Sequence, residues 1–118
     1  MKQDNYFIGK KYEKIAGEFL KSKNCQILEY NFSCKFGEVD IIAKDGEYLV
    51  FCEVKYRKNI KTGYPLEAVG IQKQTILSKC AMYYLTIHGL LYMSVRFDVI
   101  GILADDIEWI QNAFEYKG

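Results

Sequence analysis

The sequence from Gly37 to Arg57 reads GEVDIIAKDGEYLVFCEVKYR, and this stretch decides the fold. Asp45-Gly46 is a strong β-hairpin signal, because the residues of a tight hairpin turn need positive φ. The flanking runs are rich in Val, Ile, Leu, Phe and Tyr, which favour strands. We therefore predict a hairpin in which Asp45 and Gly46 form the loop and Lys44 faces Glu47.

The alternation of side chains on this hairpin predicts an acidic site. In the predicted register Asp40 lies opposite Phe51 and diagonal to Glu53, at roughly 7–8 Å between Cα atoms. One face then carries Glu38, Asp40, Ile42, Leu49, Phe51, Glu53 and Lys55, and the other Val39, Ile41, Ala43, Tyr48, Val50, Cys52 and Val54. Two such carboxylates can hold one metal ion beside the Lys55 ammonium, as in sites that cleave phosphodiesters.

Both faces of the hairpin are largely apolar, so we expect the sheet to be covered on both sides. The charged residues of the acidic face stand at the end far from the turn, whereas a solvated face stays polar along its length. Grouped acids repel one another unless a proton or a cation lies between them. The alternative is a hairpin with ordinary surface acids and an ion pair between Glu38 and Lys55, and spacing alone does not separate the two.

Length and composition indicate which broad class of protein this chain belongs to. The chain has 118 residues, of which 50% are hydrophobic and 26% charged, which predicts one globular domain spanning residues 1–118. No apolar run has the length of a membrane span and no signal peptide is evident, so we expect a cytoplasmic protein. Four cysteines without C-x-x-C spacing, and a single histidine, favour buried thiols over a zinc site.

The remaining pattern predicts an α/β/α sandwich with a mixed sheet. Helical periodicity and turn signals predict helices over Tyr6–Lys21 and Leu66–His88, strands over Cys25–Ser33 and Tyr92–Leu103, and a short final strand or helix over Ile107–Gln111. On the later strand Arg96 and Asp98 share a face, where we favour a structural ion pair. Gly9 and Gly17 weaken the first helix, which suggests that another group approaches it closely.

The chain carries a series of short motifs whose order is similar to that in a known protein family. The landmarks are Gly9-x-x-x-Glu13-x-x-Ala16, Asn31, Gly37-Glu38-Val39-Asp40, Val50-Phe51-Cys52-Glu53-Val54-Lys55-x-Arg57, Pro65-x-Glu67-Ala68-Val69, Lys73 and Arg96-Phe97-Asp98-Val99. From Gly9 to Phe114 the chain resembles the YraN-like uncharacterised bacterial proteins, which are similar to Holliday-junction-resolvase-type members of the PD-(D/E)xK nuclease superfamily. The resemblance implies a restriction-endonuclease-like fold. Val39 stands where the superfamily pattern has proline.

The same resemblance implies a metal-dependent endonuclease acting on DNA, with branched or single-stranded forms as candidate substrates. Asp40, Glu53 and the Val54 carbonyl are the implied ligands of Mg²⁺ or Mn²⁺, hard cations that prefer oxygen. Lys55 is implied to orient or deprotonate the attacking water, or to stabilise charge on the phosphate. Glu13 resembles the extra acid that completes the site in some resolvase-like members.

Several residues keep alternative interpretations. Glu13 is otherwise a surface acid beside the lysines of its own helix, and Glu38 either supports the site or pairs with Lys55. Lys73 resembles the helix-borne Gln or Lys near such active sites, and we include it among the nucleic-acid contacts. Its alternative is a lysine whose stem lies along the helix edge.

Basic residues cluster despite a net charge of only +1. The loop with Arg57, Lys58 and Lys61, interleaved with Tyr56 and Tyr64, suits contacts to a phosphate backbone and stacking on bases, although a solvated loop is the competing interpretation. A second group, Lys10, Lys11 and Lys14, lies on the first helix.

Two other functions compete with the nuclease. One is a non-catalytic nucleic-acid-binding adaptor that keeps the nuclease fold, and the other is a structural partner protein. Symmetric cleavage of two strands at a junction needs two sites, so the nuclease hypothesis is compatible with a homodimer.

Overall fold

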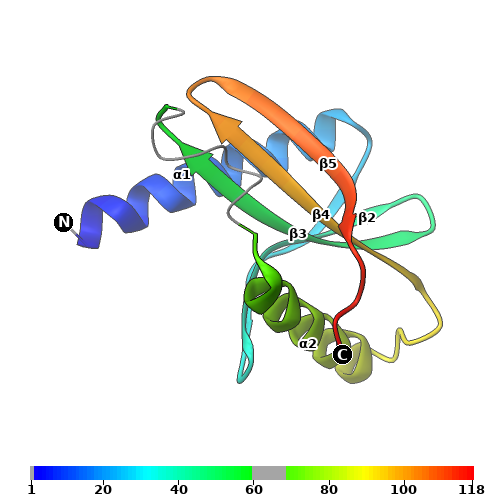
Figure 1. The fold of residues 1–118 in the computed structure, drawn as a ribbon. Helices are drawn as coiled ribbons and strands as arrows, with labels where there is room; N and C mark the ends of the chain where they lie inside the picture. The colour runs from blue at the N-terminus through cyan, green and yellow to red at the C-terminus, as the bar shows by residue number, and fades with distance from the viewer. Residues whose placement is uncertain (1, 60–68) are drawn as a thin grey trace.

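One mixed β-sheet with a helix on each face makes up the described chain (Figure 1). A computed structural model describes residues 2–59 and 69–118, with side chains from residue 8 onward. Its elements are α1 (Lys2–Ser22), β1 (Gln26–Cys34), β2 (Gly37–Asp45), β3 (Tyr48–Arg57), α2 (Ile71–His88), β4 (Ser94–Leu103) and β5 (Asp106–Phe114). The strand order is β1-β2-β3-β4-β5, with β3 and β4 parallel and all other neighbours antiparallel. The predicted α/β/α sandwich is confirmed, and it is compatible with a restriction-endonuclease-like fold.

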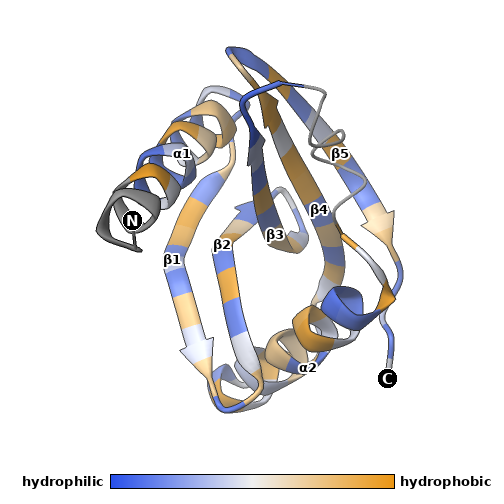
Figure 2. Ribbon diagram, turned by 60° about the vertical axis from the view of Figure 1, so that its left-hand side comes forward, coloured by the Kyte–Doolittle hydropathy of each residue, from blue (hydrophilic) through white to orange (hydrophobic). Residues whose placement is uncertain are grey.

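Two hydrophobic layers, one on each face of the sheet, form the core. The α1 layer contains Ala16, Leu20, Ile41, Ala43, Val50, Cys52, Ile100 and Ile102. The α2 layer contains Phe32, Val39, Ile42, Leu49, Phe51, Leu77, Cys80, Ala81, Tyr84, Leu85 and Phe97. Orange bands along β3 and β4 in Figure 2 mark the centre of this sheet. Because helices cover both faces, charged groups at the strand ends are placed next to apolar surroundings, as the sequence predicts.

The hairpin turn lies one residue later than predicted. Asp45 pairs with Tyr48, so Gly46 and Glu47 form the loop, and Ile42 lies opposite Phe51, a shift of two residues from the predicted pairing. Of the two loop residues only Gly46 has positive φ (59°), as in a type II′ turn rather than the expected type I′ turn. The shift is even, so it leaves the alternation near the turn unchanged.

The start of α2 also differs from the prediction. The predicted start at Leu66 falls within residues 60–68, outside the described chain, whereas Val69 and Gly70 are described and are not helical. Gly70 is the N-cap, with φ −81° and ψ 178°, and α2 begins at Ile71. The later start leaves the helix ending at His88, as predicted.

Gly17, but not Gly9, shows the close approach that the sequence suggests. A Cβ at position 17 would overlap the Tyr30 hydroxyl, while nothing lies within 4 Å of a Cβ at position 9. Gly17 therefore lets the Tyr30 side chain of β1 lie directly against the α1 backbone.

The Arg96–Asp98 ion pair is confirmed as the centre of a buried network. Asp98, fully buried, accepts hydrogen bonds from Arg96 Nε (2.9 Å) and Nη2 (2.8 Å), from Trp109 Nε1 (2.9 Å) and from the Asn112 N–H (2.9 Å). Arg96 Nη2 also donates to Asp45 at 3.0 Å, so the network links the hairpin end to β4 and β5. Every oxygen of Asp98 is thereby paired, which offsets the cost of burying the charges.

The cysteines are mostly buried thiols, as the sequence predicts. Cys25, Cys52 and Cys80 are buried, Cys34 is partly buried, and all four are free thiols. Neither helix in the described chain carries an apolar stretch long enough to span a lipid bilayer.

Asp98→Ala tests the buried network. Removing the carboxylate leaves the buried Arg96 guanidinium with only its contact to Asp45 and leaves the Trp109 and Asn112 N–H groups without their acceptor, so we expect the free energy of unfolding to fall by about 3–5 kcal/mol. Urea denaturation followed by circular dichroism measures this change. Asp105→Ala, in an exposed turn, is the matched control and should change stability by less than about 0.5 kcal/mol. Equal effects of the two substitutions would contradict the structural role of Asp98.

Candidate metal centre

The candidate site lies where two strands interrupt the alternation of their side chains. On β2, Ile41 packs in the α1 layer and Ile42 in the α2 layer, but Val39 also packs in the α2 layer. Residues three apart on a regular strand point to opposite faces, so β2 changes over between Val39 and Ile41, at Asp40. The prediction that Val39 and Ile41 share a face is therefore wrong, and strict alternation does not fix the direction of Asp40.

A matching break occurs in β1 at Asn31, which has a positive φ of 55°. Tyr30 lies against α1, whereas Phe32, two residues later, packs in the α2 layer. Asn31 and Asp40 face each other in the register, between the pairs Tyr30–Ile41 and Phe32–Val39. Both strands therefore change faces at the same level of the sheet.

Asp40 stands where β2 and β3 separate. Their pairing ends at Ile41 and Cys52, and one further step in that register brings Asp40 opposite Glu53 rather than diagonal to it. The Asp40 carboxylate replaces the missing ladder bond by accepting a hydrogen bond from the Val54 N–H at 2.9 Å. Asp40 therefore contacts the N–H group of Val54. A role for the Val54 carbonyl as a metal ligand stays a prediction.

Three carboxylates gather at this opening. Glu13, Glu38 and Asp40 each offer one oxygen, and these oxygens lie within 4.8 Å of one another. The Glu13 side chain, 14% exposed, comes from α1 and hydrogen-bonds to Asn31. Glu38 is exposed and accepts a hydrogen bond from the Ser33 hydroxyl at 3.1 Å. Glu13 is therefore brought to Asp40 as predicted and is not a fully solvated surface acid.

Glu53 lies beside Asp40 but outside the cluster of three carboxylates, and it pairs with two lysines. Its side chain is 3% exposed, and its Oε2 lies 3.4 Å from both Lys55 Nζ and Lys73 Nζ. Lys73 belongs to the first turn of α2, so each helix supplies a charged group to the site. Lys55 pairs with Glu53 and not, within the described residues, with Glu38 as in the alternative interpretation.

The electrostatics of the site favour a cation. Burial raises the pKa of both Glu13 and Glu53 to about 7, and the neighbouring charge of Asp40 adds to each shift. Lys73 and Lys55 lower the pKa of Glu53 but do not offset these effects. Glu13 Oε1 and Glu53 Oε1 are buried and accept no hydrogen bond from any described residue. Buried carboxylate oxygens without donors are costly, and a hard divalent cation is the ligand that such donors match.

The predicted basic loop is described only in part. Arg57 Nη1 donates to the Tyr56 carbonyl oxygen at 2.9 Å, and Lys58 is exposed. The Tyr56 ring stacks on Tyr12 of α1, with centroids 3.8 Å apart, rather than being left open for a base. Lys61 lies outside the described residues.

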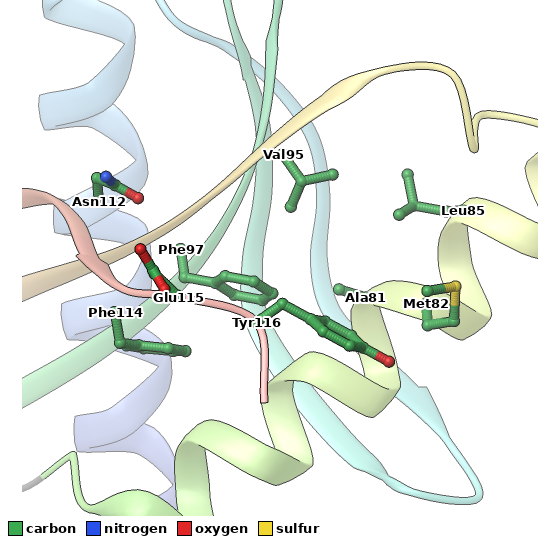
Figure 3. A pocket seen from close by; sticks show the side chains of 9 residues that line it. All are labelled: Ala81, Met82, Leu85, Val95, Phe97, Asn112, Phe114, Glu115 and Tyr116. Carbon is green, nitrogen blue, oxygen red and sulfur yellow. The ribbon is translucent and has the colours of Figure 1, made fainter. Parts of the chain in front are cut away.

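A separate apolar cavity of about 290 Å³ lies between α2, β4 and the C-terminal segment (Figure 3). Its walls include Met82, Phe97, Phe114 and Tyr116, and its one acid is Glu115. None of the four acids of the candidate metal centre lines it. We therefore assign the chemistry to the opening in the sheet.

The left-handed backbone of Asn31 and its contact with Glu13 are not predicted from the sequence. Asn31 appears among the family landmarks, but its left-handed backbone and its hydrogen bond to Glu13 have no signal in a period-two pattern. An asparagine within a strand is the available clue, because Asn tolerates positive φ better than most residues. Glu38, predicted only as a supporting acid or an ion-pair partner, also joins the cluster.

Fold and site together define an α/β protein with an acidic centre at an opening in its sheet. The chain belongs to the Uncharacterised protein family UPF0102, whose model matches residues 12–102, so the YraN-like resemblance is confirmed. It is 49% identical to a UPF0102 protein of Thermodesulfovibrio yellowstonii, over 91% of this chain and 95% of the relative. The chain is also 48% identical to a UPF0102 protein of Geotalea daltonii, over 97% of this chain and 94% of the relative. It is 44% identical to a UPF0102 protein of Lachnoclostridium phytofermentans, over 90% of this chain and 91% of the relative.

The raised pKa values predict a pH-dependent stability without metal. Between about pH 4.5 and 7, folded Glu13 and Glu53 bind more protons than the unfolded chain does. Stability from these groups should therefore decrease as pH rises through this window and level off above it. Urea denaturation in EDTA at several pH values measures the slope, which Glu53→Gln should reduce. The exposed Glu47→Gln is the control, and an unchanged slope in Glu53→Gln would contradict the assignment.

Proposed function

We propose that this protein is a metal-dependent endonuclease that hydrolyses phosphodiester bonds in DNA. The observation that carries the proposal is the cluster of Glu13, Glu38 and Asp40 at one opening in the sheet, with Glu53 beside Asp40 and two buried carboxylate oxygens that lack donors. Lys55 and Lys73 lie beside them. Acids and lysines in this arrangement suit phosphoryl transfer, in which positioning and charge stabilisation provide most of the catalysis.

Asp40 and Glu53 are the proposed ligands of Mg²⁺ or Mn²⁺, and Glu13 completes the oxygen donor set. When bound, such a cation supplies Lewis acidity toward a phosphoryl oxygen and lowers the pKa of a water. The Val54 N–H fixes one Asp40 oxygen, so the carboxylate is oriented before any ligand arrives. Burial, reinforced by the neighbouring charge of Asp40, raises the pKa of Glu13 and Glu53 to about 7, so cation binding near neutral pH should release protons.

Lys55 has the proposed role of stabilising negative charge on the scissile phosphate. Its ammonium is 3.4 Å from Glu53 and 26% exposed, so it is anchored at the acids and remains open to a substrate. During hydrolysis a water gives up a proton to solvent and its oxygen bonds to phosphorus, while one ester P–O bond breaks and the leaving oxygen takes up a proton. Negative charge builds on the phosphoryl oxygens in the transition state. Lys73 stands at equal distance from Glu53 and offers a second cation. We propose Arg57, Lys58 and Lys61 as contacts to the flanking backbone.

A shift in melting temperature tests cation binding before any substrate is known. A cation that binds only the folded state stabilises it, by about 2.7 kcal/mol at 100 times its dissociation constant. We therefore expect Mn²⁺ to raise the melting temperature of the wild type, measured by calorimetry, but not that of Asp40→Asn. Glu47→Gln is the control and should respond like the wild type. An equal rise in Asp40→Asn would place the cation elsewhere.

Cleavage assays test the reaction itself. Duplex, single-stranded and four-way-junction DNA are incubated with the protein in Mg²⁺ or Mn²⁺, and products are separated on denaturing gels. We expect Glu53→Gln to abolish cleavage and Lys55→Met to slow it by about 10²–10³-fold, the usual cost of losing one charge-stabilising donor. Cleavage by Glu53→Gln at the wild-type rate, or no cleavage of any substrate by the wild type, would refute the proposal.

One observation favours a second candidate, a non-catalytic nucleic-acid-binding adaptor. Two ammonium groups already lie at Glu53, which partly neutralises the acids without a metal. An adaptor should bind DNA in EDTA as tightly as in Mn²⁺, and Asp40→Asn should leave binding unchanged. A melting temperature that does not respond to Mn²⁺, together with such binding, would favour the adaptor over the nuclease.

A further inference from the structure

A second cavity, of about 270 Å³, adjoins the candidate metal centre between α1 and β1. Lys10, Glu13, Lys14, Glu18 and Lys21 line it from the helix, and Tyr30 and Asn31 line it from the strand. We refer to these seven residues as the α1–β1 groove. Apart from Glu13, they have no part in the roles proposed above.

The groove is continuous with the acids. Glu13 lines the groove and belongs to the carboxylate cluster, and its Oε1 atom lies 3.9 Å from Lys10 Nζ. Asn31 lines the groove and hydrogen-bonds to Glu13. A ligand lying in the groove therefore reaches the carboxylates at Glu13.

The lysines form a row along one side of α1. At 100° per residue, positions 10, 14 and 21 fall within about 40° of one another around the helix. The row is about 16 Å long, which exceeds a single phosphate. A chain of phosphates therefore suits the row better than a mononucleotide does.

The acids beside this row offset its charge only in part, and Lys10 pairs with Glu13 at 3.9 Å. Lys14 forms no ion pair with any residue in the described ranges 8–59 and 69–118. Lys21 pairs with Glu18 at 3.0 Å, but both side chains are more than half exposed, and such pairs hold weakly. A phosphate can take the place of the Glu18 carboxylate at Lys21.

Tyr30 gives the groove an aromatic wall. It is 39% exposed, and the absence of a side chain at Gly17 lets its hydroxyl end rest against the helix. Bases stack on exposed aromatic rings only when they are unpaired, so this wall distinguishes a single strand from a duplex. Lysines along a backbone path with an aromatic ring beside them are the usual features of single-strand binding surfaces.

We propose that the α1–β1 groove binds a single strand of nucleic acid and leads it to the acids at Glu13. As a path to a cleavage site this assignment rests on the proposed nuclease function, but binding itself does not need the metal. The substrate class that follows is DNA with an unpaired segment, such as a flap or a frayed arm, rather than a continuous duplex.

The test measures binding in EDTA, where no cleavage occurs. Fluorescence anisotropy of a labelled 12-nucleotide oligo-dT gives the dissociation constant across a salt series. We expect Lys14→Gln to weaken binding about fivefold at 0.1 M salt and to reduce the slope of log K against log salt by about 0.7, the value for one phosphate contact. Tyr30→Leu should weaken binding about fivefold or more with the slope unchanged, because stacking releases no counterions.

Matched controls and outcomes separate this proposal from the nuclease function. Lys79→Gln, an exposed lysine on α2, should bind as the wild type does, and circular dichroism checks the fold of each variant. Wild-type affinity in both Lys14→Gln and Tyr30→Leu, or tighter binding of a 12-base-pair duplex than of the single strand, would overturn the groove assignment. Weakened binding in both variants with no cleavage by the wild type would support the groove and refute the nuclease. Cleavage by the wild type, with binding unaffected in both variants, would support the nuclease and refute the groove.

Discussion

The structure depends on one interruption of the sheet, where Asn31 and Asp40 face each other. Each strand changes faces at this level, and the pairing of β2 with β3 stops next to it, at Ile41 and Cys52. Without the interruption, regular alternation would keep Glu13 of α1 and Glu53, which pairs with Lys73 of α2, on opposite sides of a closed sheet. The opening instead lets charged groups from both layers meet, and it does so next to covered apolar faces.

The location of the opening between two apolar layers explains the raised pKa values of its carboxyl groups. Apolar layers on both sides remove water from Glu13 and Glu53, and their proximity to Asp40 adds repulsion, so both carboxyl groups hold protons up to about neutral pH. The lysines of the site oppose these shifts only in part. Unpaired buried acids of this kind are the local departures from good pairing that commonly mark functional sites. The Arg96–Asp98 network, in which both Asp98 oxygens accept hydrogen bonds, shows the contrast within the same sheet.

The sequence predicts most of the sheet, and the structure brings the predicted acids Glu13 and Asp40 together. Apolar runs on both hairpin faces predict the covered sheet, and the shared strand face predicts the Arg96–Asp98 pair. The turn type is missed because Asp45-Gly46 and Gly46-Glu47 both suit a two-residue loop, and Asp45 bonds to Arg96 instead. The break at Asn31 is missed because local periodicity carries no information on left-handed backbone within a strand. The pairing of Lys73 with Glu53 depends on how α2 packs, which tertiary contacts decide.

Anomalous diffraction from crystals grown with Mn²⁺ tests the central claim most directly, because it locates the cation without relying on activity. The structure predicts an anomalous peak bound by carboxylate oxygens of Asp40 and Glu53, with Glu13 in the same donor set. A map without a peak at the opening between β2 and β3, in which Glu53 still pairs only with Lys55 and Lys73, would contradict the claim that these acids form a metal centre.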